Sequence, residues 1–374
     1  METKRDTTAT EVNDLKNLNR EQLSDFLENL GLQSYRADQV FQWLYQKGAA
    51  TFEEMTNLSK DLRAQLAEIA EIKTIREFSR QESKDGTVKF LFELDDPNQY
   101  KIEAVLIPDL YDDGTVNRLT VCVSSQVGCM FGCSFCATGK MGYFRNLTHG
   151  EIVDQVRMIN DFAEERFGKK ITNIVYMGMG EPLHNYHAVT ESVRIITDPL
   201  GLEMAARRIT ISTVGLSKQI KQLADEDLGT NLAISLHAAD DKKRNEIMPI
   251  NESLNLASLK EALTYYFRET HSPITYEYLL FNHFNDTMED ADKLAEIVRW
   301  VPSKVNIIMY NNVQGVELQR VNEERLNRFM KRLISKDVTA TVRRSRGDDI
   351  DAGCGQLAVK EGTAKGKSLV KEKA

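Results

Sequence analysis

The sequence predicts an α/β protein in which a parallel sheet of six βα units follows a small helical domain. Residues 1–75 carry helical periodicity, and residues 76–118 hold strand-like stretches. From residue 119 onward, apolar strands alternate with amphipathic helices. Such alternation indicates parallel strands joined by helical crossovers. Six units are too few for a closed eight-unit barrel, so an open barrel or a doubly wound sheet fits the count.

Three helices are expected in the first 75 residues. Asn19 can cap the first, "REQLSDFLENLG", and the second, "RADQVFQWLYQKG", ends at Gly48. The third is "SKDLRAQLAEIAEI". Their apolar residues recur at helical spacing, so they most simply form the core of a small domain, and RNA contact by that domain is the alternative.

Strand patterns take over after residue 75. "TVKFLFEL" and "YKIEAVLIP" can pair through a turn at "DDPNQ", and "RLTVCVSS" leads into a cysteine-rich loop. The later strands are "TNIVYMG", "RRITISTVG", "LAISLHA", "TYEYLLF" and "KVNIIMY". The helices between them are "HGEIVDQVRMINDFAEERF", "HAVTESVRIIT", "LSKQIKQLA", "SLKEALTYYFR" and "EDADKLAEIVRWV". A helix "EERLNRFMKRLIS" and a last strand-like "TATVRRS" close the pattern.

Composition narrows the class of protein. The 374 residues are 41% hydrophobic and 28% charged, as in ordinary globular proteins. The formal net charge of −8 by itself argues mildly against nucleic acid, although "ARRITIS", "TVRRSRGDD" and the tail are locally basic. The N-terminus has no apolar signal segment and no run is long enough to span a membrane, so a cytoplasmic protein is expected.

Four of the five cysteines lie in "CVSSQVGCMFGCSFCATG", and Cys129, Cys133 and Cys136 form a C-x3-C-x2-C pattern. A closed structural zinc site needs four ligands, and the fourth is missing nearby because His149 stands where a helix should begin. Three thiolates on a [4Fe–4S] cluster leave one iron open for an external ligand. A catalytic cluster, a zinc site and unrelated thiols all remain open on spacing alone.

The motifs together resemble a known family. C-x3-C-x2-C with Phe135 before the last cysteine, followed by "MGMGEP", is similar to the radical S-adenosylmethionine (SAM) superfamily. The ordered set "CVSSQVGC", "FCATG", "NIVYMGMGEPL", "RRITISTVG", "ISLHA", "MPIN" and "RGDDIDAGCGQLA" resembles the RlmN family of dual-specificity RNA adenine-C2 methyltransferases within it. The resemblance runs from about residue 19 to residue 361.

The resemblance implies a fold and a division of the chain. The family's fold is a partial (β/α)6 radical SAM barrel with a small N-terminal helical domain. On this chain the accessory domain covers residues 1–75, and a strand hairpin extension carrying Glu103 covers 76–118. The barrel and its methyl-carrying cysteine loop cover 119–361, and a basic flexible tail covers 362–374.

The resemblance also implies cofactor contacts. Cys129, Cys133 and Cys136 would hold one [4Fe–4S] cluster. SAM, which is both methyl donor and radical source, would contact residues at the strand ends, namely Gly180, Glu181, Ser212, Ser235, Leu236, His237 and Asn311. The family's proline after the asparagine is absent here, so Asn312 is an alternative to Asn311.

The resemblance also implies a radical mechanism, in which three further residues take part. Cys354 would receive a methyl group from one SAM, and a second SAM would supply the radical that activates it against adenine carbon 2. Glu103 would accept the carbon-2 proton, and Cys122 would release the product through a transient disulfide with Cys354. Without the resemblance, Glu103 would be taken for a solvent-facing strand carboxylate and Cys354 for a small buried residue.

The implied activity is methylation of an adenosine in the peptidyl transferase centre of 23S rRNA and of the adenosine beside the anticodon in tRNAs. An electron donor of the flavodoxin or ferredoxin type would be needed, and no membrane partner is expected. One alternative is the sister enzyme that methylates carbon 8 of the same rRNA adenosine. Others are a radical SAM enzyme acting on a protein and a zinc-stabilised RNA-binding protein without activity.

Overall fold

The computed structural model describes residues 13–353 and 355–357, so Cys354 and the tail at 362–374 lie outside the described residues. The three expected helices are present as α1 (Arg20–Asn29), α2 (Tyr35–Tyr45) and α3 (Lys60–Ile69). Asn19 and Gln22 form a capping box at the start of α1, in which each side chain accepts the backbone N–H of the other residue. Their buried apolar residues belong to a hydrophobic cluster that continues into the rest of the protein.

Helix α3 ends earlier than its periodicity predicts. Ala70–Glu71 forms a short strand, β2, which pairs in parallel with β1 (Asn13–Asp14). The Asp14 carboxylate accepts the backbone N–H groups of Lys16 and Lys73, each at 3.1 Å. These bonds tie the two ends of the helical region together, and they compete with a further helical turn.

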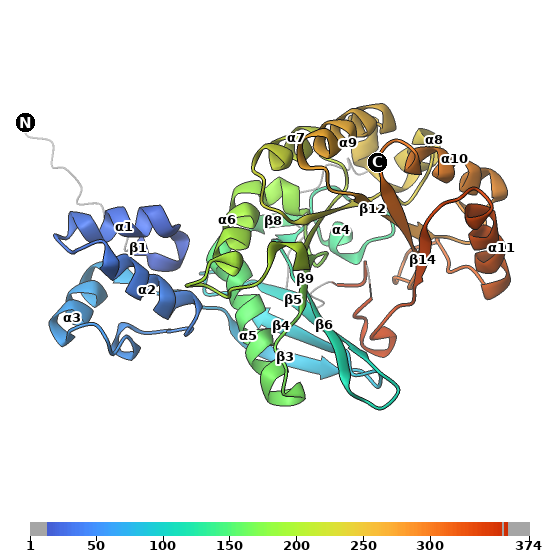
Figure 1. Ribbon diagram of the computed structural model, residues 1–374. Coiled ribbons are helices and arrows are strands. Elements are labelled where there is room, and N and C mark those ends of the chain that lie inside the picture. The colour runs from blue at the N-terminus through green and yellow to red at the C-terminus, as the bar shows by residue number, and fades with distance from the viewer. Residues whose placement is uncertain (1–12, 354, 358–374) are drawn as a thin grey trace, which may run out of the picture.

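A buried ion pair joins this helical region to the rest of the protein. Lys16 Nζ lies 2.7 Å from Asp154 Oδ1, and both side chains are at most 2% exposed. Asp154 belongs to α5 (His149–Phe167), which begins at His149 as expected. A Cβ at Gly150 would lie 2.8 Å from the Lys16 carbonyl oxygen, so only glycine allows the segment of Lys16 to pack this closely on α5. Figure 1 shows α1, α2 and α3 as a lobe beside α5 and α6 (Tyr186–Thr197).

Replacing Lys16 with Met is expected to lower the free energy of unfolding by about 3 kcal/mol, because buried Asp154 keeps only the more distant Arg157, at 3.9 Å, as a cation. The matched control is Lys73→Met, which breaks an exposed pair with Glu71 and should cost less than about 1 kcal/mol. Urea unfolding of both variants measures the difference. Equal losses would show that the buried pair is not what holds the lobe in place.

The main sheet contains ten strands in the order β14-β13-β12-β11-β10-β9-β6-β5-β4-β3. The strands from β6 to β14 in this sheet run parallel, and "TATVRRS" is the last of them. Because β14 and β3 are the two edges, the sheet is open, as the number of units predicts. The parallel strands are β6 (Val116–Cys122), β9 (Asn173–Tyr176), β10 (Ile209–Thr213), β11 (Asn231–Ser235), β12 (Ile274–Leu280), β13 (Ser303–Met309) and β14 (Ala340–Arg343).

Three antiparallel strands extend the sheet beyond β6. The strands β4 (Val88–Glu93) and β5 (Lys101–Leu110) were expected, whereas β3 (Arg76–Glu82) was not. Every residue of β3 is exposed, so the strand carries no apolar alternation. It is a strand only because its backbone pairs with β4. On one face, the Lys101 ammonium lies 3.7 Å from the centre of the Phe78 ring.

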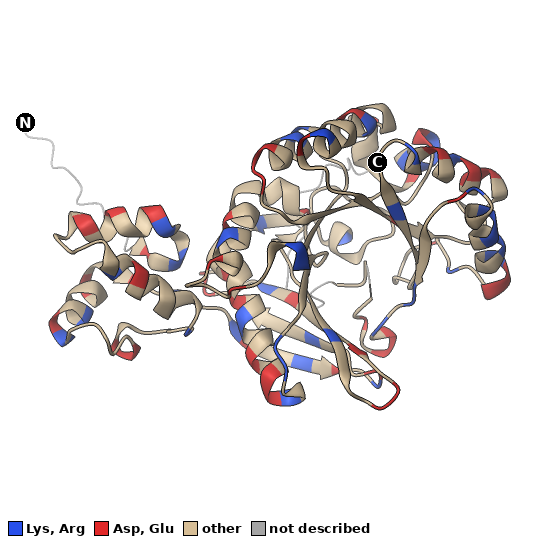
Figure 2. Cartoon of the chain, in the orientation of Figure 1, with Lys and Arg blue, Asp and Glu red and all other residues tan. Residues whose placement is uncertain are grey.

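Helices cover the outer side of the curved parallel sheet (Figure 1). Besides α5 and α6 they are α7 (Ser217–Asp225), α8 (Asp241–Ile247), α9 (Leu256–Thr270), α10 (Met288–Val298) and α11 (Glu323–Ile334). Acidic and basic side chains are intermixed over these helices (Figure 2). None of the described helices is long and apolar enough to cross a membrane.

A small two-stranded sheet flanks the cysteine loop. Strands β7 (Gln126–Gly128) and β8 (Tyr143–Asn146) form a small antiparallel pair on either side of α4 (Ala137–Met141). A Cβ at Gly128 would lie 1.8 Å from the Gly142 carbonyl oxygen, and Gly128 has a φ of 73°. The glycine of "QVGC" is therefore required for the chain to turn back under the cysteines.

Candidate active site

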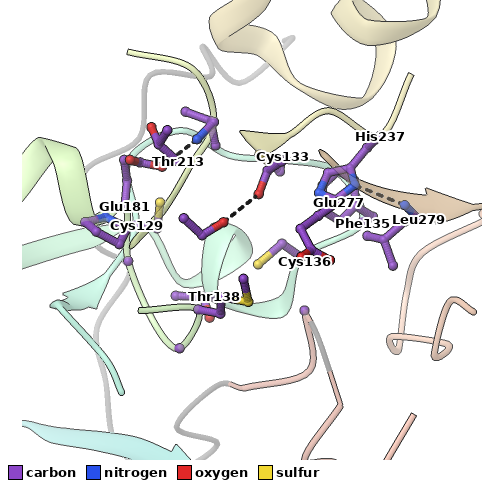
Figure 3. A pocket seen from close by; sticks show the side chains of 18 of the residues that line it. Cys129, Cys133, Phe135, Cys136, Thr138, Glu181, Thr213, His237, Glu277 and Leu279 are labelled. Carbon is purple, nitrogen blue, oxygen red and sulfur yellow. Dashed lines mark hydrogen bonds between the residues drawn. The ribbon is translucent and has the colours of Figure 1, made fainter. Parts of the chain in front are cut away.

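A cavity of about 130 Å³ lies where the cysteine loop meets the carboxyl ends of the parallel strands (Figure 3). Side chains at these ends converge in α/β folds, which is why active sites form there. The cavity brings together most of the residues expected to hold a cluster and SAM. They are Cys129, Cys133, Cys136, Gly180, Glu181, Ser212, Ser235 and His237.

The three cysteines line this cavity from one tight loop. The Cys133 carbonyl accepts the N–H of Cys136 at 3.1 Å, and α4 begins directly after Cys136. Burial raises the pKa of all three thiols, to about 12 for Cys129. Thiols of this kind lose their protons when a metal binds, because the thiolate is the ligand form.

The donor set fits a cluster better than a single ion. The cavity lining supplies three thiols, those of Cys129, Cys133 and Cys136. A single zinc ion needs ligands that meet at one point in a tetrahedron. An iron–sulfur cluster is bound by cysteine thiolates on separate irons, so three cysteines around one cavity suit it.

Glu181 presents a buried carboxylate to the same cavity. Its Oε1 accepts the N–H of Leu183 at 3.0 Å, and its Oε2 accepts the N–H of Val214 at 2.9 Å. Burial raises the pKa of Glu181 to about 7. Gly180 before it has a φ of 101°, and a Cβ there would lie 2.6 Å from the Cβ of Gln126. The Thr213 side chain also hydrogen-bonds this carboxylate, which leaves one of its lone pairs to accept a ligand N–H.

The later strand ends add neutral polar groups. The hydroxyl oxygens of Ser212 and Ser235 lie 3.4 Å apart on β10 and β11. His237 Nδ1 accepts the N–H of Leu279 at 3.1 Å, and its ring meets Phe135 edge to face at 4.9 Å. Burial and the charge of Arg244 lower the pKa of His237 to about 3. The imidazole is therefore neutral, and its Nε2 carries a proton that it can donate.

Two expected SAM contacts lie outside the lining of this cavity. Leu236 is fully buried, and its N–H is bonded to the Glu277 carbonyl at 3.0 Å. Asn311 accepts a hydrogen bond from the Ser345 hydroxyl at 2.6 Å and donates one to Gln356 at 3.4 Å. Its side chain thus holds the C-terminal segment, and Asn312 is exposed.

A second cavity, of about 80 Å³, lies beside the first and shares Met177, Ile308 and Leu357 with it. Cys122 lines this second cavity, and so does Gly353, the neighbour of Cys354 in the chain. Its remaining lining is partly basic, with Arg343, Arg344 and Arg346. The cavity therefore joins Cys122 to the start of the Cys354 loop and borders the cysteine cavity.

Glu103 lies on the same face of the sheet as Cys122. Cys122 on β6 stands directly opposite Val105 on β5, and Glu103 is two residues from Val105. The Glu103 side chain is 8% exposed and lies 3.3 Å from Lys89 Nζ. The interpretation of Glu103 as a solvent-facing carboxylate is therefore wrong.

Family comparisons agree with this geometry. Residues 13–72 match the profile of the ribosomal RNA large subunit methyltransferase N-terminal domain, and residues 123–296 match the radical SAM superfamily. The chain is 52% identical to a probable dual-specificity RNA methyltransferase RlmN of Salinibacter ruber, over 94% of this chain and 95% of the relative. A protein of the same name from Cytophaga hutchinsonii is 47% identical, over 95% of this chain and 96% of the relative.

The chain belongs to the RlmN family of radical SAM RNA methyltransferases. Its fold agrees with that of a radical SAM methyltransferase from Sphaerobacter thermophilus, with a TM-score of 0.84 and 42% identity. The alignment covers 92% of this chain and 99% of that one. Membership of the RlmN family makes the activity that of a radical SAM RNA methyltransferase.

Two buried ionisable residues near the site, Arg244 and Glu277, were not predicted from the sequence. Arg244 is 1% exposed and donates hydrogen bonds to the carbonyls of Val214 and Leu236, which fixes the ends of β10 and β11. Glu277 lines the cysteine cavity, and its Oε1 accepts from Asn306 at 2.8 Å. The signal for Glu277 is an acidic residue inside the apolar strand "TYEYLLF".

Proposed function

We propose that this protein methylates carbon 2 of an adenosine in the peptidyl transferase centre of 23S rRNA and of the adenosine beside the anticodon in tRNAs. The observation that carries the proposal is the pair of adjoining cavities. One holds three cysteines and the polar strand ends, and the other holds Cys122 beside the start of the Cys354 loop. The chain neighbours of Cys354 line both cavities, with Gly353 in the second and Gly355 in the first.

The residues of the first cavity fit a cluster and SAM. Cys129, Cys133 and Cys136 would ligate one [4Fe–4S] cluster, and Glu181 would accept a hydrogen bond from the SAM amino group. Gly180, Ser212, Ser235 and His237 complete the proposed SAM contacts of this cavity. Leu236 and Asn311 lie outside its lining and are proposed as contacts from the family resemblance alone. When bound, the two groups supply a methyl group, the radical that takes a hydrogen atom from it, and an acceptor for the electron that the adduct gives up.

The chain's own residues carry the remaining steps. The Cys354 thiolate accepts a methyl group, and its activated carbon then bonds to carbon 2 of the adenine. Glu103 accepts the carbon-2 proton. The Cys122 thiolate attacks the Cys354 sulfur, which forms a disulfide and breaks the carbon–sulfur bond, and the released carbon takes a proton to become the new methyl group. A dithiol reductant restores both thiols.

The proposal assigns parts to the whole chain. Residues 1–75 and the basic tail at 362–374 are the candidates for RNA contact, and residues 76–118 carry Glu103. Residues 119–361 form the catalytic barrel. The proposed RNA substrates and the need for reduced thiols suit a cytoplasmic protein, and the proposed electron donor is of the flavodoxin or ferredoxin type.

The position of the new methyl group tests the proposal. Cluster-loaded protein is reduced and given SAM with a 23S rRNA fragment or with tRNA transcripts, and the digested RNA is then separated by mass spectrometry. We expect 2-methyladenosine from both RNA classes. 8-Methyladenosine would instead assign the protein to the sister activity. A colourless, zinc-loaded protein without product would support a binding protein.

A further inference from the structure

Lys89 is a buried cation between two parts of the proposed catalytic machinery. Its side chain is only 10% exposed, and Nζ lies 3.3 Å from Glu103 Oε1. The same nitrogen lies 3.5 Å from the carbonyl oxygen of Asp351, three residues before Cys354. We propose that Lys89 is a positioning residue that holds the Glu103 carboxylate and the Cys354 loop beside each other through its contacts with Glu103 and Asp351. This inference rests on the function proposed above.

Sheet geometry explains why a lysine can do this. Lys89 stands opposite Val105 and Leu91 stands opposite Glu103 on the antiparallel strands β4 and β5. Lys89 and Glu103 are therefore diagonal neighbours on one face of the sheet. The long lysine stem spans the diagonal and still reaches the Asp351 carbonyl, since the ammonium offers three N–H donors.

Further contacts hold the loop against the hairpin that carries Lys89. The Ser83 hydroxyl donates to Asp349 Oδ1 at 2.5 Å, and the N–H of Gly347 donates to Asp85 Oδ2 at 3.0 Å. Ser83 and Asp85 both lie in the turn between β3 and β4. The bond from Lys89 to Asp351 continues this row toward Cys354, so the loop and Glu103 are fixed to the same hairpin.

The charge of Lys89 matters as well as its reach. A carboxylate accepts a proton only when it is ionised, and burial disfavours the ionised form. An ammonium within hydrogen-bonding distance favours it. Lys89→Met removes this ammonium from beside the Glu103 carboxylate and also removes the bond to the Asp351 carbonyl.

The test separates two stages of the proposed reaction. Methylation of Cys354 needs no base, whereas breakdown of the protein–RNA adduct does. Lys89→Met should therefore keep its iron and its methylated Cys354, seen in the mass of the tryptic peptide. It should resolve the adduct at least about tenfold more slowly than the unchanged protein. Lys89→Arg, which keeps the charge, should restore most of the rate.

Two further variants make the outcome decisive. Lys101→Met breaks a partly buried pair with Glu93 on the same two strands and should resolve the adduct at the normal rate. Lys89→Gln removes the charge while keeping an N–H donor, and it replaces Lys89→Met should that variant not fold. The inference fails if Glu103→Gln traps the adduct but neither neutral Lys89 variant does. If Glu103→Gln resolves normally, the proposed base is wrong and the inference falls with it.

Discussion

Cys122→Ala protein, purified without oxygen from cells, is expected to carry RNA covalently bound through Cys354. The thiol of Cys122 is the group proposed to break the carbon–sulfur bond, and Cys122 lines the same cavity as Gly353. Its removal leaves the adduct with no route to product. Nuclease trimming followed by mass spectrometry of the Cys354 peptide should show an added adenosine, and the sequence of the attached RNA identifies the substrate.

The matched control is a Cys122→Ala, Cys354→Ala double variant, which should carry no RNA. A Cys122→Ala protein that binds no RNA and still turns over would contradict the resolving role. Cys122 would then be a packing residue, as its 8% exposure among apolar neighbours also allows.

Cys129→Ala protein is expected to lose its cluster and all methylation. Two remaining thiols cannot hold a cluster for which the loop provides three ligands, so bound iron should fall from about four per chain to a small fraction of that. Iron analysis and the visible absorption of anaerobic protein measure the loss.

Cys122→Ala is the control for this experiment as well, and it should keep its iron. Cys122 lines the second cavity rather than the first, although only six residues separate it from the cluster loop. Iron that persists in Cys129→Ala, or is lost equally in Cys122→Ala, would overturn the assignment of ligands.

Much of the cysteine cavity could be predicted because its parts follow strands. Parallel strands bring their carboxyl ends to one edge, so Cys129, Glu181, Ser212 and Ser235 converge although about 106 residues separate the first from the last. The motifs at these ends are local in sequence, and the alternation of strands and helices fixes their order. The cavity therefore follows from pattern and topology together.

Residues positioned by the C-terminal segment were harder to predict. Glu103 stands among apolar neighbours on a strand, a pattern typical of an exposed carboxylate, yet its side chain is only 8% exposed. The segment after β14 hydrogen-bonds to the turn before β4, on the hairpin whose next strand pairs with that of Glu103. Asn311 follows a strand like the other site residues, but it hydrogen-bonds Ser345 and Gln356 instead of lining the cavity. Contacts between segments so distant in the chain leave no periodic signal.

The edge strand β3 could not be predicted from the sequence for a different reason. All its residues are exposed and all but Phe78 are polar, so neither hydrophobic alternation nor burial marks it. Only backbone hydrogen bonds to β4 define it, and these depend on the hairpin being already in place. Lys89 escaped notice for a related reason, since a lysine between Val88 and Phe90 ordinarily points to solvent.

The isotopic content of the product tests the central claim, which is that the methyl group passes through Cys354 and loses a hydrogen atom on the way. SAM with a fully deuterated methyl group is turned over many times with the RNA substrate, and the methyladenosine is weighed by mass spectrometry. The account predicts a methyl group with two deuterium atoms, the third appearing in 5′-deoxyadenosine. A methyl group with all three deuterium atoms would mean direct transfer from SAM and would contradict the account.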